Sequence, residues 1–221
     1  MDIEAELDRL HSRARGIPLL LRFAELNRVL LSVGFFAPGL SKLLGLRFTR
    51  LPIEDPVGFF FEALYRAGLY WRFLGAMQVL AAVLVLIPVT AHLGALLFLA
   101  ILTNITLITL SLPFDGTPVV ALMMLLASVY LVCWDYPRWK TLMPLKFKRP
   151  IPISVMPRIS MVERTGYLLA AFGGWSITAV MRGLAGGFSA EVFTAGNIVV
   201  LIGGGVFLWG CLRNARLNMS P

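Results

Sequence analysis

The chain has 221 residues, 58% of them hydrophobic and 14% charged, with a formal net charge of +8. Soluble domains carry about 25% charged residues, so this composition excludes an ordinary soluble domain. From Phe73 to Phe114, 42 consecutive residues include no Asp, Glu, Lys or Arg. A helix that crosses a bilayer core of about 30 Å needs about 20 apolar residues, so this run holds two spans. The sequence therefore predicts an all-α polytopic transmembrane helix bundle in contact with the lipid bilayer.

The N-terminal part of the chain combines a short surface helix with a first membrane span. Residues 2–15 have one apolar stripe among charged residues and are expected to lie on a membrane surface. A span is predicted at 26–46, with Arg28 and Lys42 near its opposite ends. Long basic side chains at helix ends usually extend to the interface, so we expect this of both residues.

The next stretch, EDPVGFFFEALYRAGLYWR, carries a helix-start signal and many aromatic rings. Asp55 suits the N-cap and Pro56 the first helical position. Glu62 and Arg66 stand four residues apart, where their charges can pair on a helix. Aromatic side chains gather at the membrane–water interface, so this helix is expected at the level of the lipid head groups.

Further spans are predicted at about 69–88, at 92–112, from the turn LPFDGTP to Trp134, at 165–183 and at 193–212. Six spans leave both termini on one side of the membrane. Lys and Arg prefer cytoplasmic segments, and 14 of the 20 basic residues fall on the side of the N-terminus. Both termini are therefore expected in the cytoplasm. The positive charge is explained by this topology and by anionic lipid, and nothing favours a nucleic-acid partner.

These predictions divide the chain into five segments: a cytoplasmic amphipathic segment at 1–23, a four-helix transmembrane bundle at 24–135, a basic, proline-rich cytoplasmic loop at 136–164, a two-helix transmembrane hairpin at 165–213 and a tail at 214–221. The loop is the candidate surface for a protein partner. Its candidate contact residues are all basic: Arg138, Lys140, Lys146, Lys148 and Arg149.

Two amides lie at comparable depth within the predicted spans. Asn104 comes eleven residues before Asp115, about 16 Å along a helix, which places it near mid-membrane. An amide at that depth needs a polar partner. In one interpretation Gln78 and Asn104 bond to each other between neighbouring helices. In the other they line a cavity for a lipophile with a polar head, such as a quinone.

Asp115 lies in the predicted turn before the fourth span. One interpretation is an N-cap or turn residue, because an aspartate there accepts backbone N–H bonds. The alternative makes it one wall of a site that opens to the outer face, near Lys42 and the segment that carries Glu62, Arg66 and Arg72.

Small residues in the last three spans are expected to serve packing. Cys133 and Cys211 form no C-x-x-C pair and are predicted to be buried apolar thiols. Gly173, Gly174 and the run 203–205 are predicted to form a packing seam, within the chain or against another subunit. We identify no catalytic and no metal-ligating residue.

The order of three features resembles the bacterial DoxX-like family of four-helix membrane proteins over residues 24–135. Arg28 precedes an apolar span ending GLSKLLGL, then come FLGAMQVLAAVLVLIPVTAHLGALLFLAILTNITL and FDGTPVVALMMLLASVYLV. The family usually has an acidic residue where this chain has Gln78, which argues against a proton-coupled role there. The resemblance implies a multi-pass protein of the bacterial inner membrane, with the last two spans as an added module.

Two functions follow from this resemblance. Some relatives look like small membrane subunits of oxidoreductase systems, and a eukaryotic relative behaves as a receptor-assembly chaperone. Together with the lack of candidate metal or redox ligand residues, the glycine seam and the basic loop, this favours an integral membrane accessory subunit or assembly factor of a larger protein complex, without catalytic residues of its own. The alternative is a quinone-binding subunit of a membrane oxidoreductase. Quinone or lipid are then the candidate ligands, held by Gln78, Asn104, Arg72, Asp115 and Lys42.

Overall fold

The structure is a computed structural model that describes residues 3–140, 159–184 and 189–217. Within these ranges every regular element is a helix, which confirms the predicted all-α class. In chain order the helices are α1 (Ile3–Arg15), α2 (Pro18–Leu43), α3 (Pro56–Arg66), α4 (Leu69–Leu86), α5 (Ala91–Ser111), α6 (Thr117–Trp134), α7 (Tyr136–Lys140), α8 (Met161–Met181) and α9 (Ala190–Leu217).

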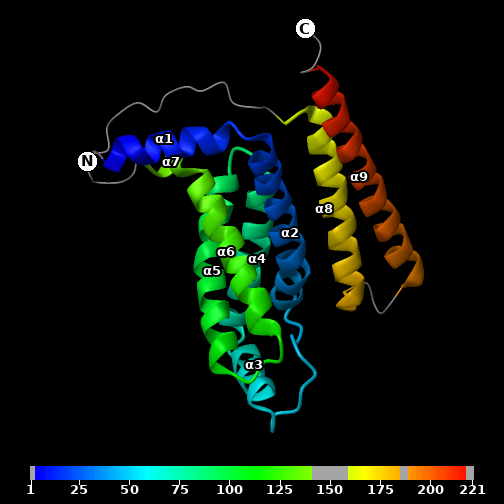
Figure 1. Ribbon diagram of the computed structural model, residues 1–221. Helices are drawn as coiled ribbons and strands as arrows, with labels where there is room; N and C mark the ends of the chain where they lie inside the picture. Colours follow the sequence, from blue (N-terminus) through cyan, green and yellow to red (C-terminus); the bar gives the residue numbers. More distant parts are fainter. Residues whose placement is uncertain (1–2, 141–158, 185–188, 218–221) are drawn as a thin grey trace.

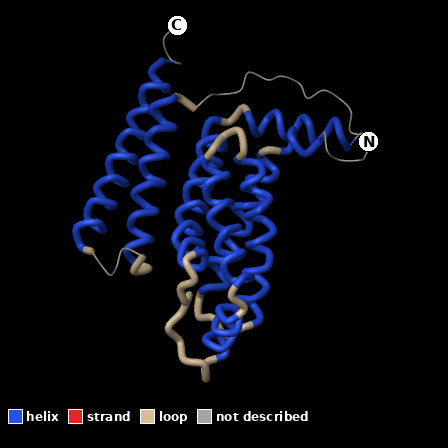
Figure 2. Tube along the Cα trace, turned by 180° about the vertical axis from the view of Figure 1, so that it is seen from behind, coloured by secondary structure: helices blue, strands red, loops and turns tan. Residues whose placement is uncertain are grey.

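Helices α2, α4, α5 and α6 run side by side as a bundle, and α8 and α9 form a hairpin that packs on α2 (Figure 1, Figure 2). Helix α1 and the short α7 lie across one end of the bundle, which we call the α1 end. Helix α3 lies at the opposite end, the α3 end. The last turns of α9 return to the α1 end (Figure 1). Which end faces the cytoplasm stays a prediction.

Four described helices are long and apolar enough to cross a membrane: α4, α5, α6 and residues Ala190–Asn214 of α9. They make this chain a membrane protein. Helices α2 and α8 have 26 and 21 residues and lie beside these four. Both contain charged residues, which lower their hydropathy, so the predicted total of six spans stays a prediction.

Two helices begin earlier than the sequence predicts. Helix α2 starts at Pro18 because proline suits the first helical turn. Helix α8 starts at Met161, where the hydroxyl oxygen of Ser160 accepts a hydrogen bond from the N–H of Glu163 at 3.2 Å. The sequence S-x-x-E is a typical helix start, and it lies within the segment predicted as loop.

Helices α2 and α4 cross at two glycines. A Cβ on Gly75 of α4 would overlap with the backbone nitrogen of Leu43, and a Cβ on Gly39 of α2 would lie 2.8 Å from the Cβ of Gln78. Only glycine allows two helix backbones to approach this closely. The crossing lies at the α3 end and brings the end of α2 against the start of α4.

The predicted glycine seam is confirmed within the chain. Gly173 faces the backbone of α9, Gly203 faces the backbone of α8, and Gly174 faces α2. Gly204 and Gly205 meet no atom within 4 Å among the described residues. The seam therefore joins α8 to α9 and joins the hairpin to the bundle, while part of the glycine run stays outside it.

One tryptophan attaches the hairpin to the bundle. The ring of Trp175 on α8 stacks on Phe36 of α2, with centroids 4.0 Å apart. Its indole N–H donates to the hydroxyl of Ser32 at 3.1 Å, and that hydroxyl donates to the carbonyl of Ala82 at 2.8 Å. Three helices are linked through a single buried serine.

Ion pairs close the α1 end of the bundle. Arg28 pairs with Glu25 at 2.6 Å and with Asp135 at 3.4 Å, and Arg15 approaches Asp135 at 3.5 Å. The prediction that Arg28 extends to the interface is wrong, because carboxylates on α2 and after α6 hold its guanidinium inside the protein.

Helix α1 packs on the bundle through its charged side. Lys140 of α7 pairs with Glu4 at 2.9 Å and with Asp8 at 2.7 Å, and all three side chains are buried. The apolar residues Leu7 and Leu10 stay exposed. Contact of this apolar stripe with a membrane surface stays a prediction.

Candidate functional site: an arginine pocket at the α3 end

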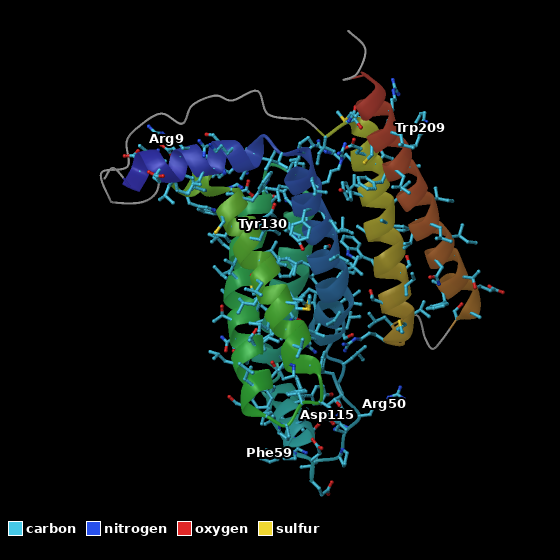
Figure 3. The ribbon with its side chains drawn as sticks, viewed as in Figure 1. Arg9, Arg50, Phe59, Asp115, Tyr130 and Trp209 are labelled. Carbon is cyan, nitrogen blue, oxygen red and sulfur yellow. The ribbon has the colours of Figure 1, made fainter. Side chains whose placement is uncertain are left out.

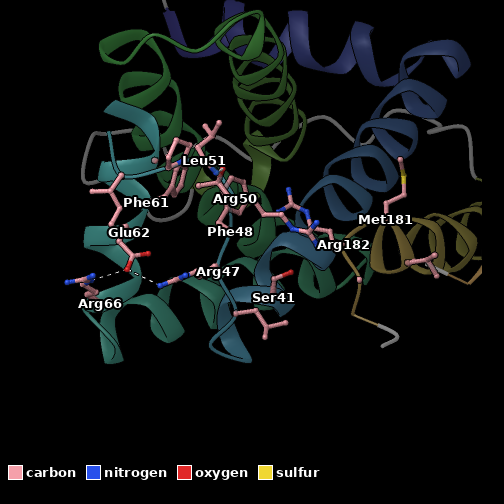
Figure 4. Close-up of a pocket in the computed structure, with 17 residues that line it drawn as sticks. Ser41, Arg47, Phe48, Arg50, Leu51, Phe61, Glu62, Arg66, Met181 and Arg182 are labelled. Carbon is pink, nitrogen blue, oxygen red and sulfur yellow. Dashed lines mark hydrogen bonds and ion pairs between the residues drawn. The ribbon is translucent and has the colours of Figure 1, made fainter. Parts of the chain in front are cut away.

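A cavity of about 1020 Å³ opens at the α3 end of the molecule (Figure 4). It lies between the segment that joins α2 to α3, helix α3 itself and the end of α8. We call it the arginine pocket, because its charged lining residues are Arg47, Arg50, Arg66, Arg182 and a single carboxylate, Glu62. The lining carries an excess of three positive charges.

Helix α3 forms one wall of the pocket and begins where the sequence predicts. Asp55 accepts hydrogen bonds from the N–H groups of Val57 and Gly58 at 2.8 and 3.1 Å, and Pro56 occupies the first turn. A Cβ on Gly58 would overlap with the carbonyl oxygen of Pro52. The wall is therefore held closely against the segment that carries two of the arginines.

The single carboxylate of the pocket is already paired. Glu62 accepts a hydrogen bond from Arg66 at 2.9 Å, as predicted from their spacing, and another from Arg47 at 3.1 Å. The hydrogen bond from Arg66, together with the nearby charge of Arg47, lowers the pKa of Glu62 below its ordinary value. Arg50 and Arg182 have no carboxylate partner among the described residues.

Phe48 lines the pocket and contacts two cations. The guanidinium of Arg182 lies 4.4 Å from the centroid of its ring, and the ammonium of Lys42 lies 4.3 Å from the same centroid. Lys42 is only 6% exposed. The ring therefore connects the open pocket to a lysine that is buried behind it.

The buried lysine has only neutral partners in the described part of the chain. Its ammonium donates to the side-chain oxygen of Gln78 at 3.0 Å and to the carbonyl of Pro38 at 3.3 Å. The ring of Trp71 lies 5.4 Å away. We call Lys42, Gln78, Phe48 and Trp71 the lysine cluster. Burying an ammonium without an opposite charge is unfavourable, so the charged form of Lys42 is disfavoured here unless an anion binds nearby.

The structure brings together two of the five predicted ligand-binding residues and separates the other three. The prediction that Lys42 extends to the interface is wrong, because the glycine crossing of α2 and α4 lets its side chain reach Gln78. The predicted bond between Gln78 and Asn104 is wrong. Gln78 bonds to α2, whereas Asn104 is exposed on α5, about 200° around the helix from the buried Leu102.

Arg72 and Asp115 lie at the α3 end but outside the pocket lining. Arg72 is exposed and passes close to Gly45. Asp115 is exposed in the turn before α6 (Figure 3). It is a turn residue as predicted but not the N-cap, which is Gly116 with a φ of 70°.

The predicted partner-binding residues have different positions from those expected. Lys140 is buried against α1. The exposed Arg138 donates to the carbonyls of Pro88 and Val89, so it also serves the fold. Lys146, Lys148 and Arg149 lie outside the described residues. The prediction of buried thiols is wrong as well, because Cys133 is exposed and Cys211 is half-buried.

Sequence reasoning missed the pocket, although it counted the residues that build it. The charge count places the arginines at 47, 50, 66 and 182 on the side of the membrane opposite the N-terminus, but it does not indicate that they meet in one cavity. The signal that could have revealed the pocket is the concentration of arginines in the short segments between the predicted spans. Arg182 joins the others only because α8 packs on α2. No group of His, Cys, Asp and Glu in the described ranges could hold a metal ion.

Comparisons with known proteins add one partial match. No family model matches this chain, and no solved structure matches it. Over 87 residues the chain is 39% identical to the uncharacterized protein YwoB of Bacillus subtilis (strain 168), an alignment that covers 37% of this chain. The match spans 56% of the relative's length. The resemblance to the DoxX-like family stays a prediction.

Proposed function

We propose that this chain is an integral membrane accessory subunit that binds an anionic group in the arginine pocket, with Lys42 as the buried opposite charge. The observation that carries the proposal is the excess of positive charge in the lining, with four arginines and one carboxylate, and a buried lysine lies behind Phe48. Ionisable groups buried in membrane proteins are costly and usually functional. An anion bound here would offset the free-energy cost of burying the charged side chain of Lys42.

A phosphate or carboxylate group has the chemistry that this pocket would bind. Guanidinium groups form paired hydrogen bonds to both anions, and Arg50 and Arg182 have no carboxylate partner among the described residues. Ligand sites typically measure about 300–1,000 Å³, so a cavity of about 1020 Å³ has room for a substituted phosphate. Such a group can come from an anionic lipid or from a soluble anion.

The role as an accessory subunit or assembly factor is supported by the family resemblance. It is tested by native mass spectrometry of the protein extracted from its own membranes in mild detergent. A partner protein in fixed stoichiometry supports the role. A chain that is extracted without any other protein contradicts it, whatever the pocket binds.

Binding to the pocket is tested with two single variants, Arg50→Gln and Arg182→Gln. A charge-assisted hydrogen bond contributes about 1.5 kcal/mol or more, so each variant should bind about tenfold more weakly. The matched control is Arg164→Gln, an exposed arginine near the opposite end of α8, which should bind like the wild type.

Two probes distinguish the possible sources of the anion. Inorganic phosphate is titrated calorimetrically, and phosphatidylglycerol is compared with phosphatidylcholine by native mass spectrometry. If the two pocket variants bind phosphatidylglycerol more weakly than the control does but bind phosphate equally, the ligand is a lipid head group. If they bind phosphate more weakly, the ligand is a soluble anion. If both pocket variants bind both probes as tightly as the control does, the proposed function is wrong.

A quinone is the second candidate, favoured by the lysine cluster. Lys42 and the amide of Gln78 can donate hydrogen bonds to a quinone carbonyl, and Phe48 and Trp71 provide aromatic surface. Lys42→Met or Gln78→Leu should then remove quinone from the purified protein. Asn104→Leu should leave the quinone content unchanged, because Asn104 lies on the outer face of α5.

A further inference from the structure

The exposed amide of Asn104 is the most unusual feature of the outer surface of the bundle. Asn104 lies seven residues before the end of α5, about 10 Å along the helix axis. Helix α5 has no charged residue and is apolar enough to cross a membrane. Asn104 is therefore located within the hydrocarbon region, on the side of α5 that faces away from the bundle.

Three other exposed polar side chains on α5 and α9 bond within their own helix. Thr103 donates to the carbonyl of Leu99 at 2.7 Å, and Ser111 donates to that of Leu107 at 2.8 Å. The amide of Asn197 on α9 donates to the carbonyl of Phe193 at 2.8 Å. Asn104 has no such bond to any residue that the structure describes. Lipid cannot supply one, because acyl chains carry no donor or acceptor.

We propose that Asn104 pairs with Asn104 of a second copy of this chain, across a two-fold axis along the membrane normal. A partner must present a polar group at the same depth in the bilayer. A second copy inserted in the same orientation does so by symmetry. A carboxamide is both donor and acceptor, so two asparagines related by a two-fold axis satisfy each other, as an isologous interface requires.

The surface around Asn104 has a suitable spacing for helix pairing. Exposed residues alternate at intervals of three and four along α5, and small side chains near the middle allow close approach. They are Leu93, Leu96, Ala100, Thr103, Leu107 and Leu110. Leucines also suit lipid, so the amide, and not the apolar stripe, is what requires a partner.

The test measures the oligomeric state of the full chain in mild detergent by native mass spectrometry. We expect a dimer for the wild type and a dissociation constant about tenfold higher for Asn104→Leu, the effect of losing an interhelical amide pair. Asn197→Leu is the matched control, since its amide bonds within its own helix, and it should remain as dimeric as the wild type.

A cross-linking experiment in native membranes locates the interface. In a chain with Cys133→Ser and Cys211→Ser, the added variant Ala100→Cys keeps Asn104 and should form a disulfide-linked dimer on mild oxidation. Adding Asn104→Leu should reduce the cross-linked fraction severalfold. A wild-type monomer, or a dimer that Asn104→Leu leaves unchanged, overturns the proposal. A different protein that is lost from the purified Asn104→Leu variant also overturns it, since the amide then has another partner.

Discussion

The crossing of α2 and α4 can be tested by adding a single methyl group at Gly75. This glycine lies directly beside the lysine cluster, because a Cβ there would lie 2.8 Å from the Cβ of Lys42 and 2.6 Å from the carbonyl oxygen of Gly39. It would also overlap with the backbone nitrogen of Leu43. The variant Gly75→Ala therefore forces the two helices apart.

The expected loss of stability follows from these contacts. Ordinary contacts between heavy atoms measure about 3.5–4.0 Å, so α2 and α4 must separate by roughly 1 Å. Overpacking costs about 1–3 kcal/mol, and two of the obstructing atoms belong to the backbone, which cannot move aside as a side chain does. We expect the overpacking to cost about 2–3 kcal/mol. Alanine favours the helix over glycine by about 1 kcal/mol, so the net loss in the free energy of unfolding is about 1–2 kcal/mol.

The control is Gly204→Ala on α9, where the added methyl group meets no atom within 4 Å among the described residues. It should retain or slightly raise the stability. Thermal unfolding in detergent should then place the midpoint of Gly75→Ala roughly 5 °C below that of Gly204→Ala. Equal midpoints would refute the close crossing of α2 and α4, and with it the position given to Lys42.

Three further predictions concern the α1 end. Asp135→Asn leaves Arg28 with one carboxylate instead of two and should destabilise the fold by about 3 kcal/mol in thermal unfolding; an unchanged midpoint would show that this pair contributes nothing. Lys140→Met leaves two buried carboxylates on α1 without their cation, so trypsin should cleave within α1 faster than in the wild type, and an equal rate contradicts this packing. Burial lowers the pKa of His11, whose Nε2 bonds to the carbonyl of Trp134 while Nδ1 lacks a partner among the described residues. The folded state therefore favours the neutral ring, and the protection factors of the α1 amides against hydrogen exchange should decrease as the pH falls below 6.5. His11→Gln should remove this dependence.

The sequence by itself determined the class of the protein and most of its helices. Composition and the charge-free run from Phe73 to Phe114 were sufficient, because a helix that crosses a bilayer must be long and apolar and these properties are local. Capping signals are local too, which is why Asp55 and Pro56 correctly marked the start of α3. The pair of Glu62 and Arg66 was predictable because it lies within one helix.

Only the tertiary structure decided which polar side chains meet. The direction in which Gln78 points depends on how α4 packs against its neighbours, and the glycine crossing turns it toward Lys42 instead of Asn104. Arg182 reaches the pocket from a helix more than a hundred residues away in the chain. Apolar spans have little periodicity to reveal their buried side, so helix rotation, and with it the site, is fixed by packing between helices.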